Sequence, residues 1–502
     1  MQRDTPMNLP KYQHFINNEL HSPDNGEWIE SFNPYTAKPW CLIPRGNKTD
    51  VDKAVSGAYN AFTKGEWPSL TPTQRGKLLR NLGDLIAKKA DDLAKIEVLD
   101  NGKLISEMSA QLHYIPQWYY YFGGLADKIE GAVIPIDKAD VFNFTRYEPL
   151  GVVVAIVPWN SPLLITAWKL APALAAGNTV VLKPSEYTSA SAFEFANLVK
   201  EAGFPPGVVN VISGYGHEIG DDLVTHPHVA KIAFTGGTQT GKRVYENAAK
   251  SIKKVSLELG GKSPNIVFED ADIDNAVKGV ISGIFAATGQ TCIAGSRLLV
   301  QESIHDKFVE KVVAMAKTAK IGDPLLKETQ VGPVTNITQF EKILGYLDIA
   351  KQEGAKCELG GKRSTAKEAG DGWFVEPTIY TQVNNQMRIA QEEIFGPVLS
   401  VIPFKDQSEA IDIANDSPFG LASGIWTSDI KRVLDVSKQI QAGTVWVNTY
   451  RMLSYLSPFG GYKQSGIGRE SGYDSIYQYM QQKSIWISTQ TETPNPFIMR
   501  LK

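Results

Sequence analysis

The chain of 502 residues contains only three cysteines, Cys41, Cys292 and Cys357. Three widely spaced cysteines exclude a disulfide framework. No Cys/His cluster has the spacing of metal ligands, so we expect no metal site. A disulfide and a metal ligand are therefore excluded for Cys292. It is either a residue of the core, where free cysteine is common, or a nucleophile.

Long hydrophobic runs and an excess of charge are also missing. The longest apolar stretches, such as "GVVVAIVPW" (151–159), are far too short to span a bilayer. The first twenty residues lack the apolar segment and small-residue cleavage site of a signal peptide. A net charge of −3 provides no basic surface for nucleic acid or anionic lipid. We therefore expect a cytoplasmic protein that binds neither membrane nor nucleic acid.

What is present is the composition of a globular protein, with 43% hydrophobic and 21% charged residues. The length predicts two or three domains. Residues 50–110 have helical periodicity, and Thr71 or Thr73 is the expected N-cap of a helix there. Residues 128–151 alternate like two short strands, which predicts a hairpin outside the main sheet.

From residue 151 the chain alternates between Val/Ile-rich strands and amphipathic helices. This pattern predicts a parallel sheet covered on both faces. A second such region runs from about residue 265 to 450, with strands expected at "SRLLVQES", "WFVEPTIY", "VLSVIPF", "SGIWTS" and "GTVWVN". The chain ends in an alternating strand and a Pro-containing arm, and an exposed strand of this kind indicates oligomer formation.

Ligands bind parallel sheets at the carboxyl ends of the strands, so the loops there are the candidate sites. "FTGGTQTG" (234–241) and "GYGHEIG" (214–220) open helices, whose N-termini bind phosphate. Each is alone more typical of a tight turn, but together they favour a dinucleotide. In "VLKPSE" (181–186), Glu186 is either a ligand of ribose hydroxyls or a favourable charge at a helix start.

Two further polar residues follow predicted strands. Glu258 in "LELGGKSPN" is either a general base with a raised pKa or a solvated surface carboxylate. Asn160 in "PWN" is either a donor to an oxyanion or a turn residue. Cys292 lies among small residues, which leave a thiol accessible, and the nearest histidines are His228 and His305.

Seven motifs follow one another along the chain: "PWN", "KPSE", "FTGG", "LELGGKSP", "GQTC", "EEIFGPV" (392–398) and "SPFGGYKQSGIGRE" (457–470). Their order and spacing resemble those of the NAD(P)-dependent aldehyde dehydrogenases, and the resemblance extends from about residue 15 to 485. The sequence is similar to the non-acylating branch, which hydrolyses its thioester. Glu258 distinguishes this branch from the acylating one, because relatives that pass the acyl group to coenzyme A lack this glutamate.

The resemblance implies an α/β fold of three parts. A Rossmann-like dinucleotide-binding domain would comprise residues 1–128 and 150–259, and an α/β catalytic domain residues 260–464. A small β oligomerisation element would comprise residues 129–149 and 465–502. Members of the family are homodimers or homotetramers. The role of the arm at 490–502, which extends beyond many relatives, is open.

The resemblance also implies the reaction, which is oxidation of an aldehyde to the carboxylic acid with NAD. Cys292 would attack the aldehyde, and Asn160 with the Cys292 backbone N–H would hold the oxyanion. Hydride loss from the thiohemiacetal would leave a thioester, which Glu258 would hydrolyse by activating water. Lys183 is included among the catalytic residues. The alternative is a non-catalytic or acyl-transferring member of the same fold.

Cofactor and substrate positions follow from the same resemblance. The cofactor residues would be Trp159, Lys183, Glu186, Gly216, Gly220, Thr235, Gly236, Gly237, Thr240, Leu259, Glu393 and Phe395. Because Glu186 would repel a 2′-phosphate, we expect NAD, with NADP as the alternative. The substrate residues would be Ser161, Leu164, Ile165, Trp168, Thr291, Ile293, Arg451, Leu453 and Phe459.

These substrate positions are largely apolar, which fits a medium-sized aliphatic or aromatic aldehyde. Arg451 is the exception. It indicates either an aldehyde that carries an acid group, or a salt bridge at the subunit surface. The sequence does not identify the aldehyde.

Overall fold

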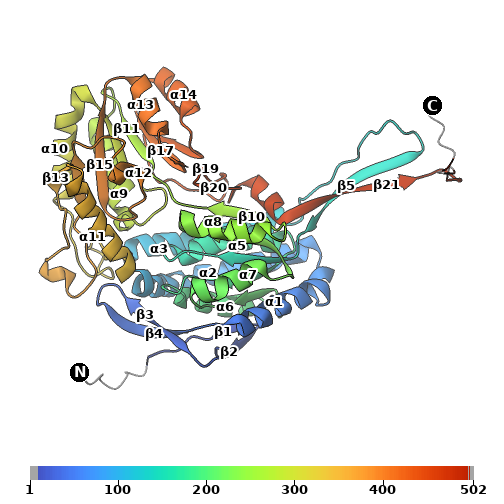
Figure 1. The fold of residues 1–502 in the computed structure, drawn as a ribbon. Helices are drawn as coiled ribbons and strands as arrows, with labels where there is room; N and C mark the ends of the chain where they lie inside the picture. The colour runs from blue at the N-terminus through green and yellow to red at the C-terminus, as the bar shows by residue number, and fades with distance from the viewer. Residues whose placement is uncertain (1–8, 494, 496, 498–502) are drawn as a thin grey trace.

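The computed structural model describes residues 9–493, 495 and 497. One part of the molecule is built on an eight-stranded sheet (Figure 1). Its strands, in spatial order, are β2 (Glu19–His21), β1 (His14–Ile16), β8 (Val209–Val211), β7 (Thr179–Lys183), β6 (Val152–Ile156), β9 (Val229–Thr235), β10 (Lys254–Glu258) and β20 (Gly466–Ile467). The five strands from β8 to β10 are mutually parallel, as the sequence predicts.

Helices cover both faces of this sheet. They are α1 (Lys48–Thr63), α2 (Pro72–Asn101), α3 (Ile105–Tyr114), α4 (Pro116–Leu125), α5 (Pro162–Ala175), α6 (Ala190–Glu201), α7 (Gly216–Thr225) and α8 (Thr238–Ala249). Alternate residues of β6 point to opposite faces. Val152 and Val154 join the core formed with α1, α7 and α8, whereas Val153 and Ala155 join the core formed with α2, α5 and α6.

The expected helix start is confirmed at Thr71 and not at Thr73. The Thr71 side chain accepts from the Gln74 backbone N–H, and the Gln74 side chain accepts from the Thr71 backbone N–H. This capping box satisfies two donors that the first turn of α2 leaves free. The helix ends before Gly102, whose φ of +73° is a left-handed conformation suited to glycine.

The second α/β region surrounds a seven-stranded sheet. Its strands, in spatial order, are β13 (Lys356–Leu359), β14 (Thr378–Thr381), β15 (Val398–Phe404), β12 (Arg297–Gln301), β11 (Pro264–Val267), β17 (Ala422–Trp426) and β18 (Thr444–Val447). Its helices are α9 (Ile273–Phe285), α10 (His305–Ala316), α11 (Ile337–Gln352), α12 (Arg388–Gln391), α13 (Gln407–Asn415) and α14 (Ile430–Gln439). All the strands are parallel except β13 at one edge. Of the expected strand "WFVEPTIY", only the part after Pro377 is in the sheet.

A ribbon formed by β5 (Val141–Pro149) and β21 (Met480–Ser488) projects from the body of the molecule (Figure 1). Before β5, the expected first strand of the hairpin forms only one isolated bridge, from Val133 to Phe144. Pro135 lacks the N–H that a regular ladder would need there. The ribbon exposes the apolar side chains of Phe142, Trp486 and Ile487. The arm at 490–502 lies partly outside the described residues.

Two small two-stranded sheets complete the fold. They pair β3 (Trp28–Asn33) with β4 (Lys38–Pro44), and β16 (Phe419–Gly420) with β19 (Tyr462–Lys463). Within the described residues, none of the helices combines the length and the apolar character that crossing a bilayer requires.

Candidate active site

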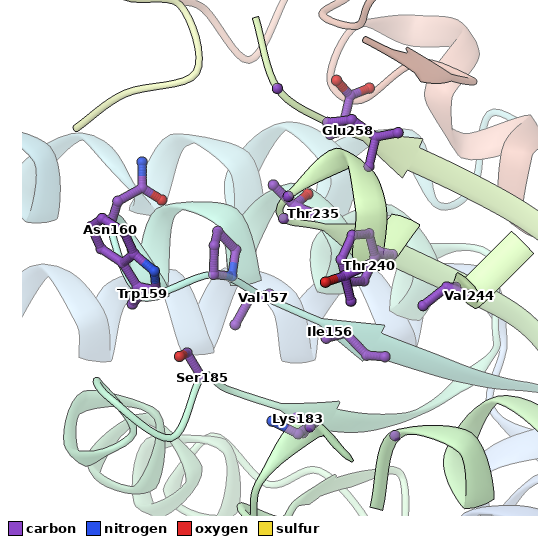
Figure 2. Close-up of a pocket in the computed structure, with 18 of the residues that line it drawn as sticks. Ile156, Val157, Trp159, Asn160, Lys183, Ser185, Thr235, Thr240, Val244 and Glu258 are labelled. Atoms are coloured by element: carbon purple, nitrogen blue, oxygen red, sulfur yellow. The ribbon is translucent and has the colours of Figure 1, made fainter. Parts of the chain in front are cut away.

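A cavity of about 500 Å³ opens at the carboxyl ends of β6, β7, β9 and β10, where a ligand site is expected in such a sheet. The residues that the sequence analysis assigned to catalysis or to the cofactor all line this cavity. They are Trp159, Asn160, Lys183, Glu186, Gly216, Gly220, Thr235, Gly236, Gly237, Thr240, Glu258, Leu259, Cys292, Glu393 and Phe395. Figure 2 shows Asn160 and Glu258 at one side of the cavity, and Lys183 and Ser185 at the other.

One end of the cavity has the features of a phosphate site. Helix α8 begins after Gly237, which provides no side-chain cap, so the N–H groups of its first turn are free to bind an anion. A Cβ atom added at Gly216, Gly220 or Gly237 would meet nothing within 4 Å. The Thr235 hydroxyl is buried without a hydrogen-bond partner. This open space, free N–H groups and an unpartnered hydroxyl fit the pyrophosphate of a dinucleotide.

Lys183 is the last residue of strand β7, and Glu186 follows it. The Lys183 Nζ donates to the Pro184 carbonyl oxygen at 3.1 Å and lies 3.5 Å from a Glu186 carboxylate oxygen. Burial lowers the pKa of Lys183, and the Glu186 charge opposes this shift. The carboxylate of Glu186 is thus oriented beside a cation, where it can accept hydrogen bonds from ribose hydroxyls and repel an added phosphate.

Glu393 and Phe395 enter the cavity from the second α/β region. A Glu393 carboxylate oxygen accepts from the Gly261 backbone N–H at 3.0 Å, and burial raises the pKa of Glu393. The Phe395 ring meets Trp159 edge-on, with ring centroids 5.2 Å apart. Gln339, which the sequence analysis missed, donates to the Phe395 carbonyl oxygen at 3.0 Å and also lines the cavity.

Cys292 follows α9 and a short turn in which Ala287 and Thr288 have positive φ angles of 53° and 55°. This tight turn brings the half-buried thiol to the cavity. Burial raises the pKa of the Cys292 thiol to about 12, and the charges of Glu393 and Glu258 add to the effect. The thiol is therefore protonated at neutral pH and needs a base before it can act as a nucleophile.

The Asn160 side chain is held in one orientation. Its Nδ2 donates to the Gln290 carbonyl oxygen at 2.9 Å. Gln290 is fixed in turn, because its side-chain oxygen accepts from the Thr335 backbone N–H at 2.9 Å. The amide nitrogen of Asn160 carries a second hydrogen, which remains available to an oxyanion in the cavity.

Glu258 ends β10 and is 3% exposed, so the alternative of a solvated surface carboxylate is not observed. Neither of its carboxylate oxygens has a hydrogen-bond partner. Burial raises the pKa of Glu258 well above its usual range, and the nearby charge of Glu470 raises it further. A carboxylate with a raised pKa accepts a proton more readily than a solvated one, as a general base requires.

Glu470 belongs to a buried ion pair that the sequence analysis missed. Its carboxylate accepts from the Lys169 Nζ at 2.7 Å, and both side chains are almost completely buried. Lys169 lowers the pKa of Glu258, against the effect of Glu470. The sequence indicates this ion pair only through Lys169, a single lysine in the middle of the apolar helix α5.

The nine expected substrate residues do not surround the cavity as the cofactor and catalytic residues do. Only Ile165 lines the cavity. Trp168 packs against Phe459 with ring centroids 5.0 Å apart. Ser161 accepts a hydrogen bond from Lys103, a buried residue that the sequence analysis did not assign. The surface salt bridge considered for Arg451 is not among the ion pairs of the described residues; its guanidinium donates to the Ser282 carbonyl oxygen at 3.3 Å.

The fold and the cavity define an NAD-dependent oxidoreductase. The chain belongs to the aldehyde dehydrogenase family, whose sequence model, described as "Aldehyde dehydrogenase family", matches residues 21–485. It is 46% identical over 495 residues to the (Z)-2-((N-methylformamido)methylene)-5-hydroxybutyrolactone dehydrogenase of Acinetobacter baylyi, covering 98% of this chain and 100% of that protein. It is 49% identical over 474 residues to an aldehyde dehydrogenase of Davidiella tassiana, covering 94% of each.

Among solved structures, the betaine aldehyde dehydrogenase of Staphylococcus aureus in complex with NAD⁺ superposes with a TM-score of 0.96. It is 41% identical and covers 97% of each chain. These comparisons confirm the predicted fold, the NAD cofactor and the oxidation of an aldehyde to an acid.

Proposed function

We propose that this enzyme oxidises its aldehyde through a covalent thioester on Cys292, which Glu258 hydrolyses by activating water. The observation that carries the proposal is the arrangement of Cys292, Asn160 and Glu258 around one cavity, at the carboxyl ends of the strands. The three residues come from different elements, and each has the environment that its role needs: an accessible thiol, an oriented amide and a buried carboxylate.

The chemistry begins with transfer of the Cys292 proton, because the thiol is protonated at neutral pH. Glu258, whose pKa is raised by burial, accepts this proton. The Cys292 sulfur then bonds to the aldehyde carbon, and the carbonyl oxygen becomes an oxyanion. The Asn160 amide and the Cys292 backbone N–H donate to this oxygen and stabilise the tetrahedral thiohemiacetal.

Bound NAD supplies the acceptor for two electrons. The carbonyl carbon of the thiohemiacetal loses its hydrogen with those two electrons and becomes a thioester. Glu258 then removes a proton from water, whose oxygen bonds to the thioester carbon as the carbon–sulfur bond breaks. One aldehyde, one NAD⁺ and one water thus give one carboxylic acid and one NADH, with protons released to solvent.

We also propose the three-part division of residues 1–128 with 150–259, 260–464, and 129–149 with 465–502. The two sheets and the projecting ribbon support it. The exposed apolar residues of the ribbon support assembly into a homodimer or homotetramer. We further propose that the enzyme acts in the cytoplasm.

Replacement of Asn160 by alanine is expected to lower kcat by about 10²- to 10³-fold, the usual effect of losing one oxyanion donor. Affinity for NAD should stay within about threefold, since the amide donates to Gln290 and faces the reacting oxygen. Steady-state kinetics and NAD titration of the purified variant measure both. A Thr381→Ala variant, at a buried site in β14, is the control for general damage. A kcat within threefold of the parent would exclude the oxyanion role.

Replacement of Glu186 by glutamine should shift the cofactor preference towards NADP. The change removes a charge that repels a 2′-phosphate and leaves the Lys183 cation nearby. We expect the ratio of kcat/KM for NAD to that for NADP to fall by about tenfold, the effect of one hydrogen bond to a charged group. An unchanged ratio would show that Glu186 does not select the cofactor.

The proposed function is tested by NADH formation, followed at 340 nm, with a panel of aldehydes in the presence and absence of coenzyme A. We expect NADH with both, and free acid as the product in both. A non-catalytic protein would give no NADH with any aldehyde, and an acyl-transferring enzyme would require coenzyme A and give a new thioester. Either result would contradict the proposal.

A further inference from the structure

Two cations lie beside the candidate reaction centre without an ion-pair partner. Within the described residues, no carboxylate oxygen lies within 4 Å of the charged nitrogen atoms of Lys103 or Arg451, so neither forms an ion pair. Lys103 is 3% exposed and donates to the Ser161 hydroxyl at 2.8 Å. Because burying an unpaired charge is costly, the position of Lys103 calls for a function.

Each cation is connected through neighbouring residues to one of the candidate catalytic residues. Ser161, which holds Lys103, directly follows Asn160, the candidate oxyanion donor. Arg451 directly follows Tyr450, whose hydroxyl donates to the carbonyl oxygen of Ile293 at 3.0 Å, and Ile293 directly follows Cys292. The charge of Arg451 lowers the pKa of Lys103, and the charge of Cys292 raises the pKa of both. Both cations are therefore near the thiol.

The backbone at Arg451 supports a specific role for its side chain. Its φ of +67° is in the left-handed region, which is unfavourable for a residue with a side chain. Strain of this kind persists where the surrounding structure imposes it, and it concentrates at functional sites. The guanidinium makes one hydrogen bond, to the Ser282 carbonyl oxygen, so its other donors are available.

The carboxylates near the two cations do not neutralise them. Glu107 acts on both, and its Oε1 already accepts from the Ala287 backbone N–H at 2.7 Å. Glu97 is fully buried and accepts from the Leu163 backbone N–H, and burial raises its pKa to about 7. Two positive charges thus face the Glu107 carboxylate, which is already held by the Ala287 N–H, and the Glu97 carboxylate, which is partly protonated at neutral pH.

We propose that the substrate is an aldehyde that carries a carboxylate, and that Lys103 and Arg451 bind this group beside Cys292. This inference rests on the proposed function of Cys292. Arg451 offers the planar donors that bind a carboxylate with two hydrogen bonds, and Lys103 adds a compact charge. The same charges disfavour a cationic aldehyde such as the betaine aldehyde in the name of the S. aureus neighbour.

The test compares ω-oxo acids with alkanals of the same chain length, using 4-oxobutanoate, 5-oxopentanoate and 6-oxohexanoate against butanal, pentanal and hexanal, with betaine aldehyde as the cationic probe. For the best oxo acid we expect a kcat/KM at least about tenfold above that of its matched alkanal, the effect of a hydrogen bond to a charged group. Betaine aldehyde should be the poorest substrate.

In Arg451→Met, the ratio of kcat/KM for the oxo acid to that for the alkanal should fall about tenfold, and Arg451→Lys should restore part of it. The control is Arg363→Met, an exposed arginine that packs over Phe340, in which the ratio should not change. Because a ratio is measured, a partial loss of folded enzyme does not affect the result, and Arg451→Lys serves as the second variant if Arg451→Met does not fold.

Equal kcat/KM values for oxo acids and alkanals in the parent enzyme would overturn the inference while leaving the proposed function intact. So would an unchanged ratio in Arg451→Met. No NADH from any aldehyde would instead contradict the proposed function, and the substrate inference with it. The two failures are thus distinguishable in one experiment.

Discussion

Cys292→Ala is expected to abolish aldehyde oxidation, with kcat reduced by about 10⁴-fold or more. The thiol forms the covalent bond to the substrate in the proposed reaction, and a methyl group cannot replace it. The fold should be kept, since alanine is tolerated at a half-buried position among small residues. NADH formation with saturating aldehyde measures the loss, and NAD titration shows that the cofactor site is intact.

The matched control is Cys357→Ala. Cys357 is exposed on β13, at the edge of the seven-stranded sheet, and it does not line the cavity. This variant should retain the activity of the parent. If Cys292→Ala kept a tenth of the parent activity, or if the two variants lost activity equally, Cys292 would not be the nucleophile.

Glu258→Gln should separate the two halves of the reaction. Glutamine cannot accept a proton from water, so the thioester should persist, and kcat should fall by about 10²- to 10⁴-fold, the range of general base catalysis. At alkaline pH hydroxide can deprotonate the Cys292 thiol, whose pKa of about 12 is the remaining barrier to attack. Rapid mixing at pH 9 to 10 should therefore show a burst of about one NADH per site before the slow steady state.

The pH dependence should differ between Glu258→Gln and the parent. In the parent, burial and the charge of Glu470 raise the pKa of Glu258 above the usual range of a carboxyl group. Steady-state turnover should rise with pH as this carboxyl loses its proton, and this rise should be missing from the variant. An exposed control, Glu201→Gln at the end of α6, should keep the profile of the parent. A variant with no burst and normal kcat would exclude Glu258 as the hydrolytic base.

The sequence predicted the main sheets because their strands are buried on both faces. Such strands form nearly continuous Val/Ile runs, as in Val152–Ile156, and alternate with amphipathic helices. The pairing of β5 with β21 could not be derived from periodicity, since more than three hundred residues separate them and either strand could have paired elsewhere. Pro135 likewise interrupts a strand that alternation alone predicts.

For the site, motifs located Cys292, Glu258 and Asn160, but their environments required the structure. A glutamate at a strand end is usually solvated, and only the packing of Glu470 and the strands around it shows that Glu258 is buried. Lys103 was missed for a similar reason. It follows a long amphipathic helix, and only the hydrogen bond to Ser161 places it near the centre.

Intact-protein and peptide mass spectrometry of Glu258→Gln is the most direct test of the covalent mechanism. The variant is mixed with aldehyde and NAD, quenched in acid during the burst, and digested. The mechanism predicts that the peptide containing Cys292 gains the mass of the acyl group, and that the gain requires NAD. An unmodified Cys292 peptide during a full NADH burst, or an acyl group on another residue, would contradict it.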